Sequence, residues 1–238
     1  MEIIVGKPPG SPDADTGAAR SIWMRRPSAA RQDPPLSRER ITEGAIALLD
    51  DEGMDRLTMR RLAERLGVGA TTLYWHIDTK DDVFDLAIDA IFEEAPLPAE
   101  PGASWREDVV AALAGCRHML LRHPWSSALP MRPAIGPNFL AWMEAVQAML
   151  VRGGLKGQHV SAAFWLLLHH VQGATTSQSS IQWSDEEIAA FQEQLDLRKE
   201  QYPTIVEHKL LAYGWEANFH LGLNYALDGI EAQVASGG

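Results

Sequence analysis

The spacing of the apolar residues limits what this chain can fold into more than any other feature of its sequence. Beyond residue 36 they recur every three or four positions, the spacing that places side chains on one face of an α-helix. In 215–235 this stripe consists of Phe219, Leu223, Ala226, Leu227, Ile230 and Val234. We find no sustained alternation of apolar and polar residues, no hairpin turn pair and no internal repeat. The sequence therefore predicts an all-α fold.

Capping and turn residues predict where the helices begin and end. Ser37, Thr58 and Thr79 each precede an apolar stripe and can accept a hydrogen bond from the first turn of a helix. Gly53 and Gly67 suit the positions where helices end. The first four helices are expected at 38–52, 59–65, 70–75 and from 80 onwards. Longer helices are expected at 104–122, 137–152, 157–182, 184–200 and 215–235.

The distribution of proline and glycine divides the chain into three parts. Residues 1–36 are rich in Pro, Gly, Ser, Ala and Asp and lack periodicity, so we expect a disordered N-terminal tail there. Within it, Trp23 is either an incidental aromatic or a short docking segment. A second break holds Pro96, Pro98, Pro101 and Gly102. We therefore expect a front domain at 37–95 and a larger rear domain at 103–236.

The charge of the chain is strongly acidic but unevenly distributed. The net charge of −11 argues against a protein that coats nucleic acid with its whole surface. Residues 20–40 nevertheless hold six arginines against two acids (+4), and residues 54–80 hold five bases against three acids (+2). The front can thus face phosphate while the rear repels it. The lone Cys116 excludes an intramolecular disulfide, and we expect a cytoplasmic protein without a membrane partner.

Residues 58–76 have the pattern of a helix-turn-helix motif, in which a short helix, a turn containing glycine and a second short helix follow one another. The motif reads TMRRLAERL, then GVG, then ATTLYWH. Leu62, Ala63 and Leu73 face inward in this arrangement, which leaves one side of the second helix free to enter a major groove. The predicted DNA contacts here are Arg60, Ala70, Thr71, Thr72, Tyr74, Trp75 and His76.

Residues 37–92 resemble the DNA-binding domain of the TetR family of bacterial transcriptional regulators. The resemblance rests on the run LYWH at 73–76, followed by Lys80, and the Trp-His pair is most similar to the tetracycline-repressor branch. It implies that Arg60 reaches a base or phosphate and that Lys80 holds a phosphate at a helix N-terminus. Trp75 lies in the motif as a contact or as a packing residue. A weaker similarity continues to about residue 235.

The resemblance also implies a homodimer that binds a palindromic double-stranded DNA operator, with a pocket for a small-molecule effector in the rear domain. Six of the eight tryptophans lie behind residue 100, and an aromatic-lined cavity suits an apolar ligand. The predicted ligand contacts are His123, Trp125, Phe139, Trp142, Met143, Trp165, His169 and Gln178. Ordinary core packing is the alternative for each of them. The family's tetracycline–magnesium ligands fall on Pro96, Pro130, Ala112 and Cys116, so that site is not expected.

The stretches 157–182 and 215–235 are interpreted as dimer helices, with an intramolecular core as the alternative. Small residues that would permit their close approach are Gly173, Ala174, Gly222, Ala226 and Gly229. For catalysis and metal binding, the chain shows no glycine-flanked serine, P-loop, dinucleotide fingerprint or HExxH motif. We therefore expect no enzyme activity, no metal and no cofactor.

The predicted function is that of a DNA-binding transcriptional regulator. Its most favoured form is a homodimeric repressor that a small, largely apolar ligand releases from its operator. Two alternatives remain open at this point. One is an activator with the same DNA chemistry. The other is a small-molecule-binding protein that keeps the helix-turn-helix only as a scaffold, an alternative that the net acidity keeps open.

Overall fold

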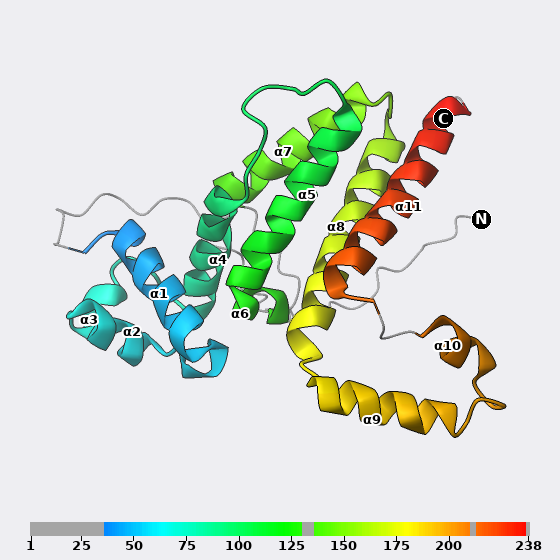
Figure 1. The fold of residues 1–238 in the computed structure, drawn as a ribbon. Coiled ribbons are helices and arrows are strands. Elements are labelled where there is room, and N and C mark those ends of the chain that lie inside the picture. Colours follow the sequence, from blue (N-terminus) through cyan, green and yellow to red (C-terminus); the bar gives the residue numbers. More distant parts are fainter. Residues whose placement is uncertain (1–35, 130–135, 210–212, 237–238) are drawn as a thin grey trace, which may run out of the picture.

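The computed structural model describes residues 36–129, 136–209 and 213–236, and all the regular elements within these ranges are helices (Figure 1). Residues 1–35 of the predicted tail, including Trp23, lie outside the described residues, as does Pro130, whereas Leu36, the last residue of that tail, is buried in the core. The elements are α1 (Arg38–Glu52), η2 (Met54–Arg56), α2 (Met59–Leu66), α3 (Ala70–Leu73), α4 (Lys80–Ile91), η3 (Phe92–Glu94), α5 (Trp105–Arg122), α6 (Pro124–Ala128), α7 (Pro137–Arg152), α8 (Gln158–Ser180), α9 (Asp185–Asp196), α10 (Pro203–His208) and α11 (Trp215–Ala235). The predicted all-α fold is confirmed.

Helices α1 to α4 form the smaller part of the molecule, and their caps are the predicted ones. Ser37, Thr58 and Thr79 each accept a hydrogen bond from a backbone N–H in the first turn of the helix that follows. The side chain of Asp82 reaches back to the backbone N–H of Thr79, which completes a capping box at the start of α4. Leu36 and residues of all four helices share one buried core.

Two local features differ from the sequence prediction. Helix α3 ends at Leu73 rather than near residue 75, because the amides of His76 and Ile77 both donate to the Leu73 carbonyl and turn the chain. Two short helices, α6 and α10, were not predicted. Each begins with a proline, at Pro124 and Pro203, and a proline is favoured at the first helical position because its missing N–H needs no partner there.

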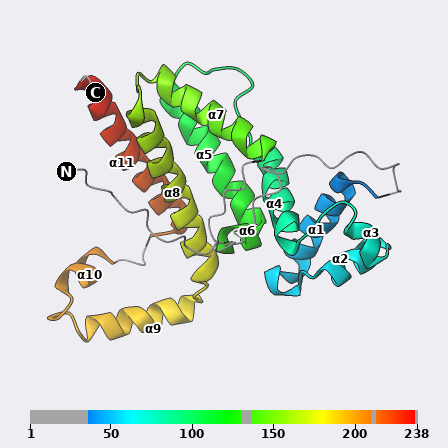
Figure 2. The ribbon, with the colours of Figure 1, turned by 180° about the vertical axis from the view of Figure 1, so that it is seen from behind.

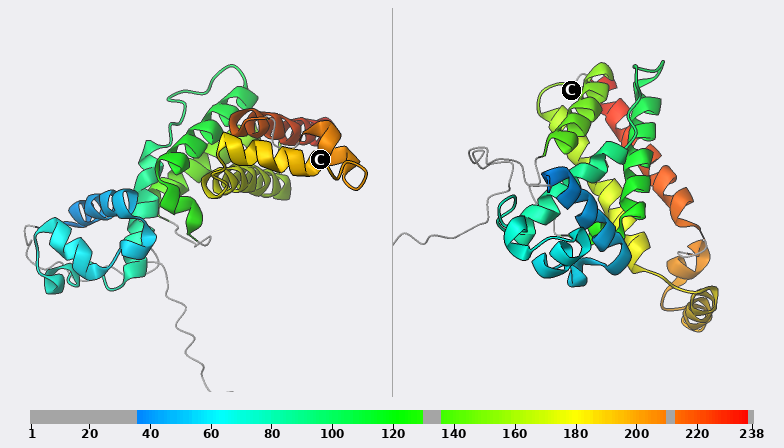
Figure 3. Two further views of the ribbon diagram at one scale, coloured as in Figure 1. Left: turned by 60° about the horizontal axis from the view of Figure 1, so that its bottom comes forward. Right: turned by 90° about the vertical axis from the view of Figure 1, so that its left-hand side faces the viewer.

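Helices α5, α7, α8 and α11 form an upright bundle beside the smaller part (Figures 1 and 2). The predicted stripe on α11 packs inward, with Phe219, Leu223 and Leu227 fully buried. Among the described helices, none combines the length and the apolar character that a membrane span requires. Helices α9 and α10 extend beyond the lower end of the bundle (Figures 1 and 3), and most of their residues are exposed.

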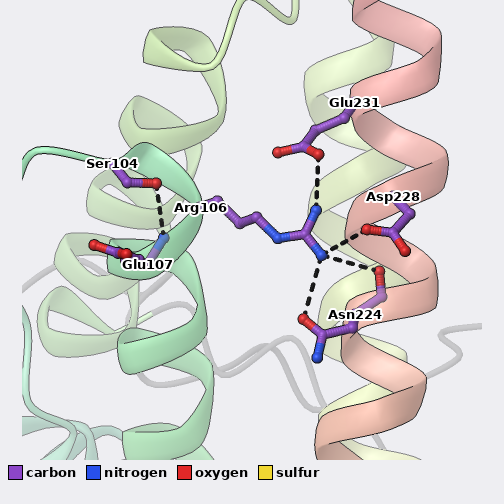
Figure 4. A network of polar contacts seen from close by, with 6 residues as sticks. All are labelled: Ser104, Arg106, Glu107, Asn224, Asp228 and Glu231. Atoms are coloured by element: carbon purple, nitrogen blue, oxygen red, sulfur yellow. Dashed lines mark hydrogen bonds and ion pairs between the residues drawn. The ribbon is translucent and has the colours of Figure 1, made fainter.

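Polar contacts as well as apolar ones hold α11 on the bundle. The guanidinium of Arg106 on α5 contacts the carboxylates of Asp228 and Glu231 at 2.7 and 2.8 Å, and it also bonds both oxygens of Asn224 (Figure 4). Gly222 lies where α11 crosses α8, since a Cβ there would be 2.7 Å from the His170 ring. The small residue at 222 therefore serves packing within the chain.

The core of the bundle gives a direct test of the fold through Cys116. This side chain is fully buried on α5, and burial raises the pKa of its thiol to about 12. Because the thiolate is the reactive form, we expect the native chain to resist iodoacetamide at pH 8 and the urea-unfolded chain to react completely, as measured by mass spectrometry. A Glu144→Cys variant, which adds an exposed thiol on α7, should react once in the native state. Rapid native labelling of Cys116 would contradict the packing of α5.

Candidate nucleic-acid interface

The turn between α2 and α3 is held in one conformation by its backbone. Gly67 adopts a left-handed conformation (φ 68°), which a glycine tolerates without strain, and its N–H donates to the Glu64 carbonyl. The N–H of Val68 closes the same turn on the carbonyl of Ala63. Leu62, Ala63 and Leu73 are buried as predicted. Helix α3 therefore leaves α2 at a defined angle and with a defined face outward.

The outward face carries the residues predicted from the motif. Ala70 and Thr71 are exposed, Thr72 and His76 are half-buried, and Tyr74 and Trp75 are 50% and 61% exposed. Aromatic side chains this exposed lose apolar burial unless a partner covers them. The chain has no acidic residue between Arg65 and Asp78. The surface of α3 can consequently approach phosphate without repulsion from a carboxylate of its own segment.

Basic side chains flank this surface. Arg60 on α2 is almost fully exposed, and its Nε lies 3.0 Å from the Glu64 carboxylate one turn further along. Surface pairs of this kind contribute little stability, so the guanidinium can exchange Glu64 for another anion at small cost. Lys80, at the start of α4, donates to the carbonyl of Met54 at 3.3 Å and lies over the Phe84 ring. These contacts hold its ammonium beside the N-terminus of α4.

His76 connects the interface to the first helix. The Nε of Arg38 on α1 donates to the His76 carbonyl at 3.3 Å. The ring atom Nε2 of His76 is buried without a hydrogen-bond partner in the described chain. An unpaired buried nitrogen of this kind costs free energy until a partner reaches it. The ring is thus placed beside the exposed face with one hydrogen-bonding position unused.

The eight predicted ligand residues do not lie together. His123 and Trp125 contact Asp50 of α1, so they lie between the smaller part and the bundle. Trp165 and His169 lie on the exposed side of α8. The side chain of Gln178 accepts a hydrogen bond from Arg117, a buried arginine on α5 that also pairs with Glu216. The structure therefore brings only some of the eight candidate residues together.

Phe139, Trp142 and Met143 on α7 do lie close to one another. The rings of Phe139 and Trp142 stack at 6.4 Å, and those of Phe92 and Phe164 complete an aromatic cluster around Trp142. Trp142 is 1% exposed, and its indole N–H has no partner among the described residues. A separate groove of about 460 Å³ lies on the outside of α5. It is lined by Glu94, Pro96, Gly115, His118, Leu121 and Arg122.

Arg117 and Asp89 are among the buried charged residues that were not predicted from the sequence. Arg117 stands on the buried face of α5, with its guanidinium 4.7 Å from the centre of the Phe219 ring, and its hydrogen bond lowers the pKa of Glu216. Asp89 on α4 accepts from the backbone N–H groups of Asn138 and Phe139 at the start of α7. Arg117 interrupts an otherwise apolar face of α5, and that interruption is the signal by which it could have been found. Asp89 shares its face of α4 with Asp85 and Glu93, so its burial leaves no such signal in the sequence.

The geometry defines a helix-turn-helix DNA-binding regulator with an attached helical bundle. Comparison with known proteins agrees. Residues 41–87 match the family model "Bacterial regulatory proteins, tetR family", and residues 97–234 match "Tetracyclin repressor-like, C-terminal domain". The chain therefore belongs to the TetR family and is a transcriptional regulator.

Individual relatives cover nearly the whole chain. An HTH-type transcriptional regulator of Saccharopolyspora erythraea is 41% identical over 91% of this chain and 93% of its own length. The HTH-type transcriptional repressor DrrR1 of Streptomyces coeruleorubidus is 29% identical over 89% and 83%. The structure of apo ActR from Streptomyces coelicolor superposes with a TM-score of 0.77 at 28% identity, covering 87% of this chain and 100% of ActR. ActR has also been solved in complex with (S)-DNPA, with a TM-score of 0.74 at 29% identity and coverage of 84% and 100%.

The contact between Asp89 and α7 predicts a pH-dependent stability. Burial raises the pKa of Asp89 above its ordinary value, although the amides of Phe139 and Asn138 act in the opposite direction. Between the ordinary pKa of an aspartate and the raised pKa of Asp89 in the folded chain, Asp89 is protonated in the folded chain and ionised in the unfolded chain. The free energy of unfolding therefore falls as the pH rises through this range. Asp89→Asn removes that loss. The free energy of unfolding of the variant, relative to wild type, should be higher at pH 7 than at pH 4 in urea titrations.

The exposed Asp55 supplies the control for this measurement. The change in relative stability between the two pH values should be larger for Asp89→Asn than for Asp55→Asn. Equal changes for the two variants would show that burial does not govern the protonation of Asp89.

Proposed function

We propose that this regulator is a homodimeric repressor that binds an inverted repeat in DNA and is released by a small, largely apolar ligand. In this proposal residues 37–95 are the DNA-binding domain, and residues 103–236 are the domain for ligand binding and dimerisation. The observation that carries the proposal is the exposed, acid-free surface of α3 on a rigid turn. A protein bound to an operator would act in the cytoplasm, at the nucleoid.

On the DNA side, the outward face of α3 enters the major groove, and basic groups on both sides hold the backbone. Thr71 and Thr72 contact base edges, while Tyr74 and His76 donate to phosphate or bases. Ala70 gives an apolar contact, and Trp75 covers the adjoining backbone. Arg60 and Lys80 supply the positive charge, and Lys80 does so where the N-terminus of α4 already favours an anion.

The proposed dimer surface is formed by the outer sides of α8 and α11. Its large apolar residues are Trp165, Leu166, Leu221 and Tyr225, each between 39% and 66% exposed. Gly173 and Gly229 leave open space around their backbones, which would allow a second copy to approach closely. Exposed apolar side chains on two adjacent helices are typical of a protein interface. Pairing of two such surfaces would bring four helices together.

We place the ligand beside the aromatic cluster of α7. Phe139, Trp142 and Met143 supply apolar contacts there, and the unused N–H of Trp142 can donate one hydrogen bond to a ligand oxygen. The ligand complex of ActR supports a small-molecule site in a protein of this fold. Ligand binding that favours one arrangement of the two DNA-binding domains would lower affinity for the operator by the difference in its affinity for the two states.

The proposal predicts the outcome of DNA selection from a random pool of duplexes by the purified protein. We expect an inverted repeat whose half-sites lie about one helical turn apart, because one α3 from each protomer would occupy successive major grooves. Affinity for the selected duplex should fall steeply with salt, as phosphate contacts release counterions. Enrichment of a single half-site, or no enrichment by protein shown to be folded, would contradict the proposal that a dimer binds an inverted repeat.

Point variants separate the proposed contact roles. Tyr74→Ala should weaken binding to the selected duplex at least tenfold in fluorescence anisotropy, whereas Tyr213→Ala, which removes another exposed tyrosine, should not. Lys80→Ala should weaken selected and random duplexes by the same factor and reduce the salt slope by about 1, because a phosphate contact carries no sequence information. A Lys80→Ala variant with altered sequence preference would refute the phosphate role.

A further inference from the structure

The DNA-binding part of the molecule (α1 to α4) contacts the bundle not only through α4 but also through the side chain of Asp50 on α1. This residue lies in the last turn of α1, and α1 packs against α6 at the lower end of the bundle (Figure 1). The indole N–H of Trp125 on α6 donates to Asp50 Oδ1 at 2.7 Å, and His123 Nδ1 lies 2.8 Å from the same oxygen. Both donors belong to the bundle.

Burial makes this contact specific. His123 and Trp125 are 6% and 5% exposed. The other ring nitrogen of His123 lies 3.3 Å from both carboxylate oxygens of Glu94, and Glu94 pairs in turn with Arg122 at 2.6 Å. The imidazole is therefore held between one carboxylate from α1 and one from η3. The side chain of Asp50 is itself 31% exposed, and one of its oxygens contacts both of these buried groups at once. Loss of Asp50 therefore removes a partner from two buried donors in one step.

The contact lies on the route between the bundle and the interface. His123 is the residue at which α5 ends and α6 begins, and α6 packs against α8. On the other side, α1 packs against both α2 and α4 and carries Arg38, which bonds the His76 backbone. A shift of α6 would therefore reach the DNA-binding helices through Asp50 without passing along α4.

We propose that Asp50, His123 and Trp125 form a junction that sets the orientation of the DNA-binding helices relative to the bundle, and thereby the half-site spacing that the dimer accepts. The three act as positioning residues. The statement about spacing rests on the proposed dimeric function, whereas the statement about orientation concerns a single chain. The two parts can accordingly be tested by separate measurements.

The orientation is tested by the distance between two spin labels in one chain. Glu43→Cys on α1 and Glu144→Cys on α7 place labels on exposed positions of the two parts, and the buried Cys116 stays unlabelled. Labelled chains are diluted with unlabelled chains so that distances between protomers do not contribute. We expect a narrow distance distribution for the otherwise wild-type chain and a distribution at least twice as broad after Asp50→Ala.

Two variants control this comparison. Asp51→Ala removes the neighbouring carboxylate, which pairs with Arg65 inside the DNA-binding part, and should leave the distribution narrow. Asp50→Asn keeps a carbonyl oxygen with two acceptor positions and should restore the narrow distribution. If Asp50→Ala and Asp51→Ala give the same distribution at the same thermal stability, the junction does not set the orientation.

DNA binding then tests the consequence for spacing. The selected duplex is compared with duplexes whose half-sites are moved apart or together by one base pair. Asp50→Ala should lower the affinity for the duplex with the selected spacing about tenfold and lower the affinity for the shifted duplexes by less. The ratio between the two affinities should therefore be smaller than in the wild-type protein. Asp51→Ala and Asp50→Asn should discriminate as wild type does.

The outcomes distinguish the two levels of the proposal. Equal weakening of all spacings by Asp50→Ala would overturn the assignment of spacing to the junction. If the wild-type protein selects no inverted repeat, the proposed dimeric function fails. The spin-label distances still decide whether Asp50 holds the orientation in that case.

Discussion

The burial of α4 is the constraint on which the rest of the structure depends. Its apolar residues Val83, Phe84, Leu86 and Ala87 are almost inaccessible to solvent, and the helix packs against α1 on one side and α7 on the other. Interiors are close-packed, so such a helix cannot move without displacing both neighbours. One rigid element thus belongs to the core of the DNA-binding part and to the bundle at once. A change in either part must be accommodated by the other.

Carboxylates on α4 make this packing specific. Burial of an ionised carboxylate is costly unless hydrogen bonds replace its water. Asp82 Oδ2 accepts from the N–H groups of residues 78 and 79, which fixes the start of α4, and Asp89 accepts from the first N–H groups of α7. Gly136 is required next to Asp89, because a Cβ there would lie 2.2 Å from the carboxylate. The start of α7 therefore has one place to dock on α4.

The sequence was sufficient for features that depend on neighbours within a few residues. The caps at Ser37, Thr58 and Thr79, the left-handed Gly67 and the inward stripe of α11 all follow from local spacing, and all are present. The exposed face of α3 follows for the same reason. The two short helices that begin with Pro124 and Pro203 were within reach of the same rules, since proline at the first position is itself a helix-start signal.

Contacts between segments that are distant in the sequence could not be predicted from local spacing. His123 and Trp125 follow the helix predicted at 104–122, and the sequence does not show which element covers them. Their aromatic rings fit an apolar pocket and a polar junction equally well, and only the position of Asp50, more than seventy residues earlier in the chain, decides between the two. The side chains of His123 and Trp125 then stabilise the contact by hydrogen bonds to Asp50 as well as by the burial of their ring surfaces. A substitution at His123 or Trp125 would therefore change the attachment of α1 to the bundle as well as the apolar packing at these positions.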